Sequence, residues 1–382
     1  MDDHLTSASP IIDAHVHIFS PDVIRDRRSY VEKDFWFRTL YADPTSRMVP
    51  YEDVLQEMDA TGVDRSVLTG FAFRDQGLCR DTNDYVIEAV RAHPDRFIGL
   101  ACVSPEMPGA LSELERCLDA GLRGCGELFP DGQDFDLMDS SGLDAVAVAL
   151  TERGLSLNIH ANEPVGHVYP GKGANTPGPC YEFARRHPDL AIVFAHMGGG
   201  LFLYEMMAEA RRVLSNVYYD TAAVPYLYRR DIYSVAALIT GPGKILFGSD
   251  YPLLSPGRYL RDTEGLDPTI RAALFGGNAV RVLGLDPSGR DATAGPAAAG
   301  LAAGREPGAV AVARGAHAST LPEDAESGGR PRGGPAAGPA ARPAAGPAAA
   351  SRPDGSRQNT RTALPPKRAA RMVGSRPSVS RR

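Results

Sequence analysis

The stretch IIDAHVHIF, residues 11–19, decides how the rest of the chain is interpreted. Its apolar residues predict a short buried strand. His15 and His17 are two positions apart, so in an extended chain they point to the same side, about 7 Å from each other. Two imidazoles placed in this way can hold one cation, provided that the fold brings further ligands to the same place.

Seven further apolar runs come after this stretch and alternate with helical patterns. The runs occupy residues 65–69, 97–103, 122–127, 156–160, 191–196, 217–220 and 245–248. Strand–helix alternation predicts parallel strands with helical crossovers. A doubly wound sheet is the alternative, but no glycine-rich fingerprint follows the first run. Residues 1–286 are therefore expected to form one α/β domain, a (β/α)8 TIM barrel, whose usual size is roughly 250 residues.

In a barrel of this type, the side chains that do chemistry come from the carboxyl ends of the strands. Four of the predicted strands end in, or run directly into, a histidine or a carboxylate. These residues are Glu127, His160, His196 and Asp250. They are expected to meet His15 and His17 on one face of the barrel. Imidazole and carboxylate ligands without a thiolate suit zinc, manganese or iron, and open coordination suits catalysis.

Five motifs resemble those of the amidohydrolase superfamily, in particular its amidohydrolase-related (amidohydrolase 2) group. They are DAHVH at 13–17, IHANEP at 159–164, FAHMGGG at 194–200, LFGSDYP at 246–252 and GNAVRVLGL at 277–285. The resemblance implies the same metal-dependent barrel. The group contains hydrolases of amides, esters and lactones, hydratases, and non-oxidative decarboxylases, so the resemblance does not imply one reaction.

The resemblance also implies roles for single residues. The family's histidine ligands correspond to His15, His17 and His160. Asp250 matches an aspartate that binds metal and moves a proton. His196 matches a histidine that polarises the substrate or acts as an acid in one-metal members, and that binds the second ion in two-metal members. Glu127 can bridge two ions, bind substrate or support the other ligands. One divalent ion is favoured over two, with Zn²⁺ expected first and Mn²⁺ or Fe²⁺ as alternatives.

A metal-dependent hydrolase of an amide, ester or lactone is the function expected first. Metal-activated water would attack the carbonyl carbon, Asp250 would take the water's proton, and His196 would stabilise the developing oxyanion. The alternative is a non-oxidative decarboxylase, a carboxy-lyase of a small unsaturated or aromatic acid, which would use nearly the same residues. A non-catalytic metal-binding barrel is an alternative of another class, and the acid–base Asp250 argues against it.

The stretch NIHANEPVGHVYPGKG at 158–173 carries the residues expected to contact the substrate. These are Glu163, His167, Tyr169 and Lys172, in the loop after His160. Lys172 and the amides of residues 198–200 can hold a carboxylate, so a small anionic substrate is expected. In the competing interpretation, the four side chains only brace one another within the loop.

The segment 19–50 is long for a connection between a strand and a helix, and it is expected to be a lid or insertion. It contains the aromatic triplet FWF at 35–37. These aromatic residues are expected to form a wall of the substrate site, with burial beneath the lid as the alternative.

Composition separates the barrel from the carboxyl-terminal part of the chain. The net charge of −6 combines an acidic body with a basic Ala/Gly/Pro/Arg-rich segment at 287–382, which is expected to be disordered. An acidic body argues against nucleic acid as a partner, and neither a signal peptide nor a membrane span is indicated. The five cysteines are expected to be reduced and buried. We therefore expect a cytoplasmic enzyme that acts on a small molecule, as a monomer or a homodimer.

Overall fold

Eight parallel strands form the centre of the structure, a computed structural model that describes residues 10–290. The strands are β1 (Ile12–His17), β2 (Arg65–Thr69), β3 (Phe97–Gly99), β4 (Gly124–Leu128), β5 (Ser156–Ile159), β6 (Ala191–Phe194), β7 (Val217–Asp220) and β8 (Ile245–Leu246). They pair in chain order as β1-β2-β3 and as β4-β5-β6-β7-β8. Each of the eight runs predicted from the sequence is thus a strand.

Backbone hydrogen bonds join these two sheets into a closed barrel. The amide of Ala101, just past β3, donates to the carbonyl of Gly124 in β4 at 2.9 Å. On the other side, the amide of His17 in β1 donates to the carbonyl of Tyr251, past β8, at 2.8 Å. Within residues 10–290 the sheet therefore has no open edge, and the predicted (β/α)8 barrel is confirmed.

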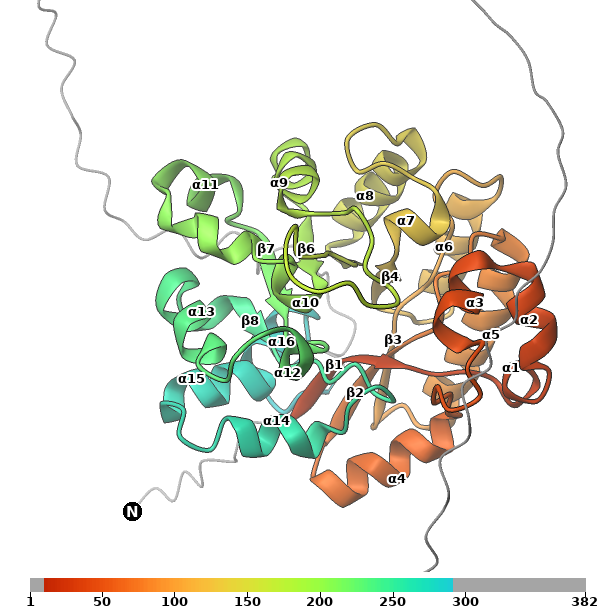
Figure 1. The fold of residues 1–382 in the computed structure, drawn as a ribbon, viewed down its shortest axis with the longest axis horizontal. Helices are drawn as coiled ribbons and strands as arrows, with labels where there is room; N and C mark the ends of the chain where they lie inside the picture. The colour runs from red at the N-terminus through yellow and green to blue at the C-terminus, as the bar shows by residue number, and fades with distance from the viewer. Residues whose placement is uncertain (1–9, 291–382) are drawn as a thin grey trace, which may run out of the picture. The chain divides into compact units, whose positions relative to one another are not determined.

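Helices surround the strands on the outside (Figure 1). The crossover helices are α4 (Tyr51–Thr61), α5 (Gln76–Ala92), α6 (Ala110–Asp119), α8 (Ser141–Arg153), α9 (Pro177–Arg186), α11 (Ala208–Val213) and α13 (Ile232–Thr240). Further α-helices are α7 (Pro130–Gln133), α10 (Ala195–Gly198), α12 (Val224–Leu227), α14 (Pro256–Asp262), α15 (Pro268–Ala272) and α16 (Asn278–Val282). Short helices of other types are η1 (Leu201–Met206), η2 (Pro242–Lys244) and η3 (Ala273–Gly277).

Local sequence signals set several of the helix boundaries. The Asp75 carboxylate accepts the amide of Leu78 at 2.9 Å where α5 begins, and the Ser140 hydroxyl accepts the amide of Leu143 at 3.0 Å where α8 begins. Each such cap stabilises a helix by about 1 kcal/mol. Helix α4 ends at Gly62, whose φ of 75° lies in the left-handed region that favours glycine.

Large apolar side chains fill the space between the strands and the helices. Phe97, Phe183 and Phe194 are among those that are completely buried. All five cysteines are buried and free, as the sequence predicts. The close-packed core therefore holds the strands in fixed positions, and this fixes the positions of the residues at the strand ends.

The long segment after β1 is helical and forms an insertion at one side of the barrel. It contains α1 (Pro21–Arg25), α2 (Arg27–Lys33) and α3 (Phe35–Tyr41), which Figure 1 shows side by side. Phe37 is completely buried and stacks on Phe73 with ring centroids 5.3 Å apart. Trp36 donates its indole N–H to the carbonyl of Asp131 at 3.0 Å, whereas Phe35 is 65% exposed. Phe37 and Trp36 therefore anchor the insertion. None of residues 35–37 is among those that line the largest cavity at the carboxyl ends of the strands, whereas Leu40, Tyr41 and Arg47 of the same segment are.

No helix among residues 10–290 combines the length and the apolar character that crossing a membrane requires. The segment predicted to be disordered, 287–382, lies outside the described residues from position 291 onward.

Candidate metal centre and active-site cavity

Six side chains predicted from the sequence to form the site meet at the carboxyl ends of the strands. They come from β1, from β4, and from the segments directly after β5, β6 and β8. Their potential ligand atoms fall into two groups, within each of which all these atoms lie within 4.8 Å of one another. The first ligand group is His15, His17 and Asp250, and the second ligand group is Glu127, His160 and His196.

Short distances connect the ligand atoms of the first group. Nε2 of His15 lies 3.1 Å from Nε2 of His17. Nε2 of His17 lies 3.6 Å from Oδ1 of Asp250. The backbone amide of Asp250 donates to the carbonyl of His15 at 3.0 Å, which ties the segment after β8 to β1.

The ligand atoms of the second group lie at least as close together as those of the first. Nδ1 of His160 lies 2.9 Å from Nε2 of His196. Oε1 of Glu127 lies 2.9 Å from the first of these nitrogens and 3.2 Å from the second. The other carboxylate oxygen of Glu127, Oε2, lies 3.4 Å from Nε2 of His15 and 3.5 Å from Nε2 of His17. The carboxylate of Glu127 therefore spans the two groups.

Hydrogen bonds on the far side of three imidazoles fix the orientation of the rings. Nδ1 of His15 lies 2.8 Å from the buried carboxylate of Asp220, at the end of β7. Nδ1 of His196 lies 3.0 Å from the carbonyl of Ala222, and Nδ1 of His17 lies 3.3 Å from that of Gly70. Since these partners only accept, each Nδ1 carries a proton, and each Nε2 is directed toward the other ligand atoms of the cluster.

The electrostatic state of the cluster depends on its burial and its charges. Burial alone would raise the pKa of the Glu127 carboxyl, but the charges of His15 and His160 and their hydrogen bonds hold it well below 4.5. Burial would lower the pKa of His15, but Asp220 and Glu127 raise it well above 6.5. In the absence of a metal ion, the carboxylates of the cluster therefore stay negatively charged and favour a protonated, positively charged imidazole at His15.

Two residues of the cluster have left-handed backbone conformations, with φ of 57° at His196 and 61° at Asp250. The sequence placed His196 at the end of the sixth strand, but β6 ends at Phe194 and His196 lies within α10. A non-glycine residue in this conformation costs on the order of 1–3 kcal/mol. The surrounding contacts hold the turn, and it aims the imidazole at Glu127.

The donor set fits a divalent cation. Lone pairs of His15 and His17 face each other at 3.1 Å, an arrangement that repels unless a proton or a cation lies between them. Imidazole nitrogens and carboxylate oxygens are ligands of zinc, manganese and iron. Bound there, such an ion would be held by the first ligand group together with Glu127.

Five of the six residues of the ligand groups line a cavity of about 730 Å³, namely His17, Glu127, His160, His196 and Asp250. Its walls come from the insertion after β1, from the loop after β5 and from the segments after β7 and β8. The lining residues include Leu40, Tyr41, Arg47, Phe71, Phe129, Tyr169, Ala223, Tyr226, Leu227, Pro252 and Leu253. This volume accommodates a small aromatic or unsaturated molecule and leaves its faces against apolar side chains.

Sequence reasoning missed Arg47, a cation in the wall of this cavity. A guanidinium nitrogen of Arg47 donates to the hydroxyl of Tyr251 at 3.1 Å, and the guanidinium carbon lies 5.2 Å from the centre of that ring. Tyr251 is 204 positions away and lies past β8. No motif marks Arg47 in the sequence, because only the path of the insertion brings it to the cavity.

Tyr41 was missed for the same reason. Its ring lines the cavity and packs against Phe19 and Phe37. Burial, with the nearby charges of Asp250 and Glu127, raises the pKa of the Tyr41 hydroxyl. The hydroxyl therefore stays protonated beside the two carboxylates and can donate a hydrogen bond.

Of the four residues predicted to contact the substrate from the loop after β5, two line the cavity and two do not. His167 and Tyr169 are among the residues that line the cavity, whereas Glu163 and Lys172 are not. The Tyr169 hydroxyl donates to Glu163 at 3.0 Å. Lys172 donates to the carbonyls of Val165 and His167 at 2.7 and 3.1 Å. Glu163 and Lys172 therefore brace the loop in this structure.

The glycine run at 198–200 also packs inside the protein rather than along the cavity wall. A Cβ at Gly199 would lie 2.1 Å from the carbonyl oxygen of Asn162, and the φ of Gly199 is 58°. This turn accepts only glycine, because a larger residue would displace the backbone after β5. The run is thus a tight turn, and the cation that faces the cavity is Arg47 instead of Lys172.

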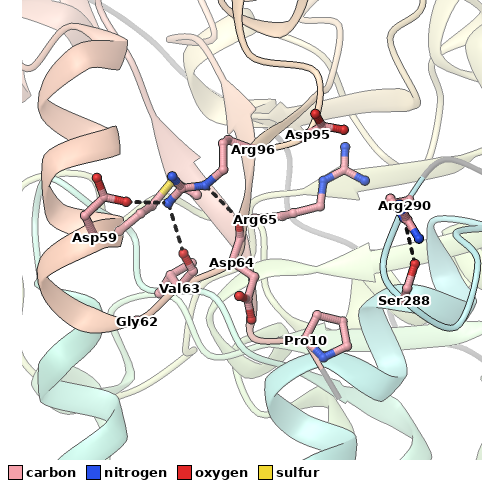
Figure 2. A pocket seen from close by; sticks show the side chains of 11 residues that line it. Pro10, Asp59, Gly62, Val63, Asp64, Arg65, Asp95, Arg96, Ser288 and Arg290 are labelled. Atoms are coloured by element: carbon pink, nitrogen blue, oxygen red, sulfur yellow. Dashed lines mark hydrogen bonds and ion pairs between the residues drawn. The ribbon is translucent and has the colours of Figure 1, made fainter. Parts of the chain in front are cut away.

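A second cavity, of about 570 Å³, lies at the opposite end of the strands (Figure 2). Arg96 there donates to the carboxylate of Asp59 at 2.8 Å and to the carbonyl of Asp64 at 3.1 Å. Arg290 donates to the Ser288 hydroxyl at 3.0 Å. The amino-terminal end of a barrel of this type contributes to stability rather than to chemistry, and the ion pair of Arg96 with Asp59 fits that role.

The closed barrel, the ligands at its strand ends and the cavity above them define a metal-dependent TIM-barrel enzyme. The chain belongs to the amidohydrolase family, because the pattern of that family (Amidohydro_2, Amidohydrolase) matches residues 12–285.

Decarboxylases are among the curated proteins that the chain resembles. The chain is 25% identical over 277 residues to 2-amino-3-carboxymuconate-6-semialdehyde decarboxylase of Dictyostelium discoideum, covering 61% of this chain and 76% of the relative. It is also 25% identical over 220 residues to gamma-resorcylate decarboxylase of Rhizobium radiobacter, covering 48% of this chain and 65% of that protein.

Solved structures show the same fold. The 5-carboxyvanillate decarboxylase of Sphingomonas paucimobilis superposes with a TM-score of 0.60 at 22% identity, covering 72% of this chain and 99% of that one. The enzyme of the same name from Novosphingobium aromaticivorans, solved with manganese and 4-hydroxy-3-methoxy-5-nitrobenzoic acid, gives a TM-score of 0.61 at 20% identity, with coverage of 72% and 96%.

Proposed function

We propose that the protein is a metal-dependent, non-oxidative decarboxylase that acts on a small aromatic or unsaturated acid. The observation that carries the proposal is that five residues of the ligand groups and Arg47 line one cavity whose walls are largely apolar. The decarboxylase relatives support this function over the hydrolase that the sequence analysis put first. The manganese in a related structure also makes Mn²⁺ as suitable a candidate as Zn²⁺.

Arg47 is proposed to bind a carboxylate of the substrate. Its guanidinium presents several N–H donors, of which Tyr251 takes one in this structure. Across the same cavity, Phe71 and Phe129 provide apolar surface for the substrate's ring or double bonds. His167 and Tyr169 are proposed to contact the end of the substrate that faces the loop after β5.

Asp250 is proposed to carry the proton. During the reaction the carbon–carbon bond to the carboxylate breaks, and its electron pair stays on the substrate carbon. A proton from the Asp250 carboxyl then forms the new C–H bond as carbon dioxide leaves. The left-handed backbone at Asp250 and its bond to His15 hold the carboxyl at the cavity floor.

A divalent cation in this centre would supply positive charge that binds substrate oxygens and stabilises the negative charge of the transition state. His15 and His17 would hold it together with Asp250, and Asp220 would keep the His15 ring in place.

The test is carbon dioxide release by Mn²⁺-loaded protein from 2,6-dihydroxybenzoate, 5-carboxyvanillate and small unsaturated dicarboxylates. In D₂O the product should carry one deuterium at the carbon that lost its carboxylate. Asp250→Asn should lower the rate by about 10²–10⁴-fold, the contribution of general acid catalysis. Hydrolysis of lactones, esters or amides without release of carbon dioxide from any acid would show that the proposal is wrong.

A further inference from the structure

We infer that Arg27 is a positioning residue of the substrate site, whose guanidinium holds the turn at 43–46 so that Arg47 can bind a substrate carboxylate. This role rests on the carboxylate site proposed for Arg47 but not on the proposed reaction. Arg27 is the first residue of α2 and is not among the residues that line the active-site cavity. It would therefore act through Arg47 and not by touching the substrate.

The cavity wall beside Arg47 is a tight turn. Thr45, Ser46 and Arg47 follow α3 and all line the cavity. The turn is closed by its own hydrogen bonds. The amide of Ser46 donates to the carbonyl of Asp43 at 3.0 Å, and the carboxylate of Asp43 accepts the amide and the hydroxyl of Thr45 at 2.8 and 2.7 Å. These bonds shape the turn but do not attach it to the rest of the protein.

Arg27 provides this attachment. One terminal nitrogen of its guanidinium donates to the carbonyl of Asp43 at 2.9 Å, and the other donates to the carbonyl of Ser46 at 3.0 Å. Within residues 10–290, these two hydrogen bonds are the ones that tie residues 43–46 to another element. The carbonyl of Ser46 belongs to the peptide unit that leads into Arg47. Arg27 therefore fixes the backbone from which the Arg47 side chain starts.

Both flanks of the turn are anchored in the protein core. On one side, the ring of Tyr41 packs against Phe19 with centroids 5.0 Å apart. On the other side, Val49 is buried, and its carbonyl accepts the amide of Phe19 at 2.9 Å. Loss of the Arg27 hydrogen bonds would therefore loosen the turn without unfolding the insertion.

The side chain of Arg47 depends on this support. Its guanidinium donates to the hydroxyl of Tyr251 at 3.1 Å, and in the part of the chain that the structure describes it forms no ion pair. A long side chain on a mobile backbone must be ordered when a ligand binds, and this ordering lowers the affinity. Arg27 removes part of that loss by fixing the backbone before the ligand arrives.

The residue type at position 27 suits this contact. A guanidinium presents several N–H donors in a rigid, planar fork. Here the fork spans the carbonyls of the first and last residues of the turn, Asp43 and Ser46. A glutamine is shorter and carries both of its donors on one nitrogen, so it cannot span the same two carbonyls. Arg27→Gln is therefore the variant that releases the turn.

The test is a double-mutant cycle on ligand binding. The Mn²⁺-loaded chain is titrated with 4-hydroxy-3-methoxy-5-nitrobenzoate and with its methyl ester, as wild type, Arg27→Gln, Arg47→Gln and the double variant. Calorimetry should show that Arg27→Gln weakens binding of the carboxylate about 3–10-fold and leaves the affinity for the ester unchanged. In the Arg47→Gln background the same substitution should change the affinity less than about twofold, because the two residues act as one unit.

Hydrogen exchange measured by mass spectrometry gives a second readout that needs no ligand. Arg27→Gln should speed exchange in peptides that cover residues 42–47, while exchange in the strands stays at the wild-type rate. Arg28→Gln is the matched control, because Arg28 is the next residue of the same helix and its side chain is largely exposed. It should behave as wild type in both measurements.

Three results would overturn the inference: equal weakening of the acid and its ester, additive effects of the two substitutions, or unchanged exchange at 42–47 in Arg27→Gln. If wild type does not bind the acid, Arg47 holds no carboxylate and the role of Arg27 falls with it.

The positioning role and the decarboxylase can fail separately. Coupled losses of binding without carbon dioxide release from any acid would remove the decarboxylase and leave the role of Arg27. Carbon dioxide release together with additive effects would remove the role of Arg27 and leave the decarboxylase.

Discussion

Nδ1 of His15 lies 2.8 Å from Oδ2 of Asp220, although 205 positions separate them in the chain. Both side chains are buried, and the other oxygen of Asp220 accepts the backbone amide of His196 at 3.0 Å. One carboxylate at the end of β7 thus orients a histidine of the first ligand group and fixes the backbone of a histidine of the second.

Asp220→Asn is expected to weaken Mn²⁺ binding by about 10–100-fold, the usual effect of removing the group that orients a metal-binding histidine. An amide keeps the size of the side chain but holds the imidazole proton less firmly. Competition with a chromophoric chelator measures the affinity. The control is Asp231→Asn, at an exposed position before α13. Unchanged affinity in Asp220→Asn would contradict the assigned role.

Arg47→Gln is expected to raise KM for a carboxylate substrate by about 10–100-fold, because hydrogen bonds between charged groups contribute about 1.5–3 kcal/mol. Since Arg47 lies in the wall and not among the ligand groups, kcat should change much less. Steady-state kinetics separate the two parameters. Arg28→Gln, a largely exposed position in the same insertion, should behave as wild type. A fall in kcat at constant KM would remove Arg47 from substrate binding.

Removal of metal is expected to lower the melting temperature. An ion that binds only the folded chain stabilises it by about 2.7 kcal/mol at a concentration 100 times its Kd. Calorimetry with Mn²⁺, with EDTA, and with Mn²⁺ restored measures the effect. Asp250→Asn should show a smaller difference between the Mn²⁺ and EDTA samples, since it lacks one ligand of the first group. Equal melting temperatures in all wild-type samples would argue against a bound ion.

Lys172→Met is expected to loosen the loop after β5. Its ammonium group holds the carbonyls of Val165 and His167, and the substitution keeps most of the apolar stem. Limited proteolysis should cut within 163–173 faster than in wild type, while thermal stability of the barrel changes little. If KM rises strongly at an unchanged rate of proteolysis, Lys172 binds substrate directly, as the sequence interpretation proposed.

Glu113→Gln is expected to destabilise the protein near neutral pH by about 1–3 kcal/mol. Burial raises the pKa of the Glu113 carboxyl, but Arg116 and Asn83 outweigh this effect and lower it below 4.5. A carboxyl with a lowered pKa stabilises the fold above its unfolded pKa, and this contribution disappears as pH falls through the folded pKa. The stabilities of variant and wild type should therefore converge below about pH 4.5.

Urea unfolding at several pH values measures this difference. Glu115→Gln on the same helix, α6, is the control, because Glu115 is exposed. A difference between Glu113→Gln and wild type that stays constant down to acidic pH would contradict the role of the carboxylate charge.

The strands and the ligand positions could be predicted because a barrel turns chain order into spatial order. A histidine or carboxylate at the carboxyl end of a strand must lie at the carboxyl-terminal face of the barrel. This rule places His160 and Glu127 without any knowledge of their neighbours. Asp220 also ends a predicted strand, and the same rule would have found it. The rule carries no information on Arg47, which lies in an insertion that obeys no periodic pattern.

The sequence by itself determined the barrel, its eight strands and the six side chains at its carboxyl end, because periodic burial and strand-end chemistry are local properties. Only the tertiary structure decided which ligand atoms of these side chains lie next to one another. That Glu127 divides its oxygens between two histidine pairs, that the left-handed turn at His196 aims one of them, and that Arg47 faces the cavity depend on contacts between segments far apart in the chain. Such contacts arise when the core packs, and no local pattern encodes them.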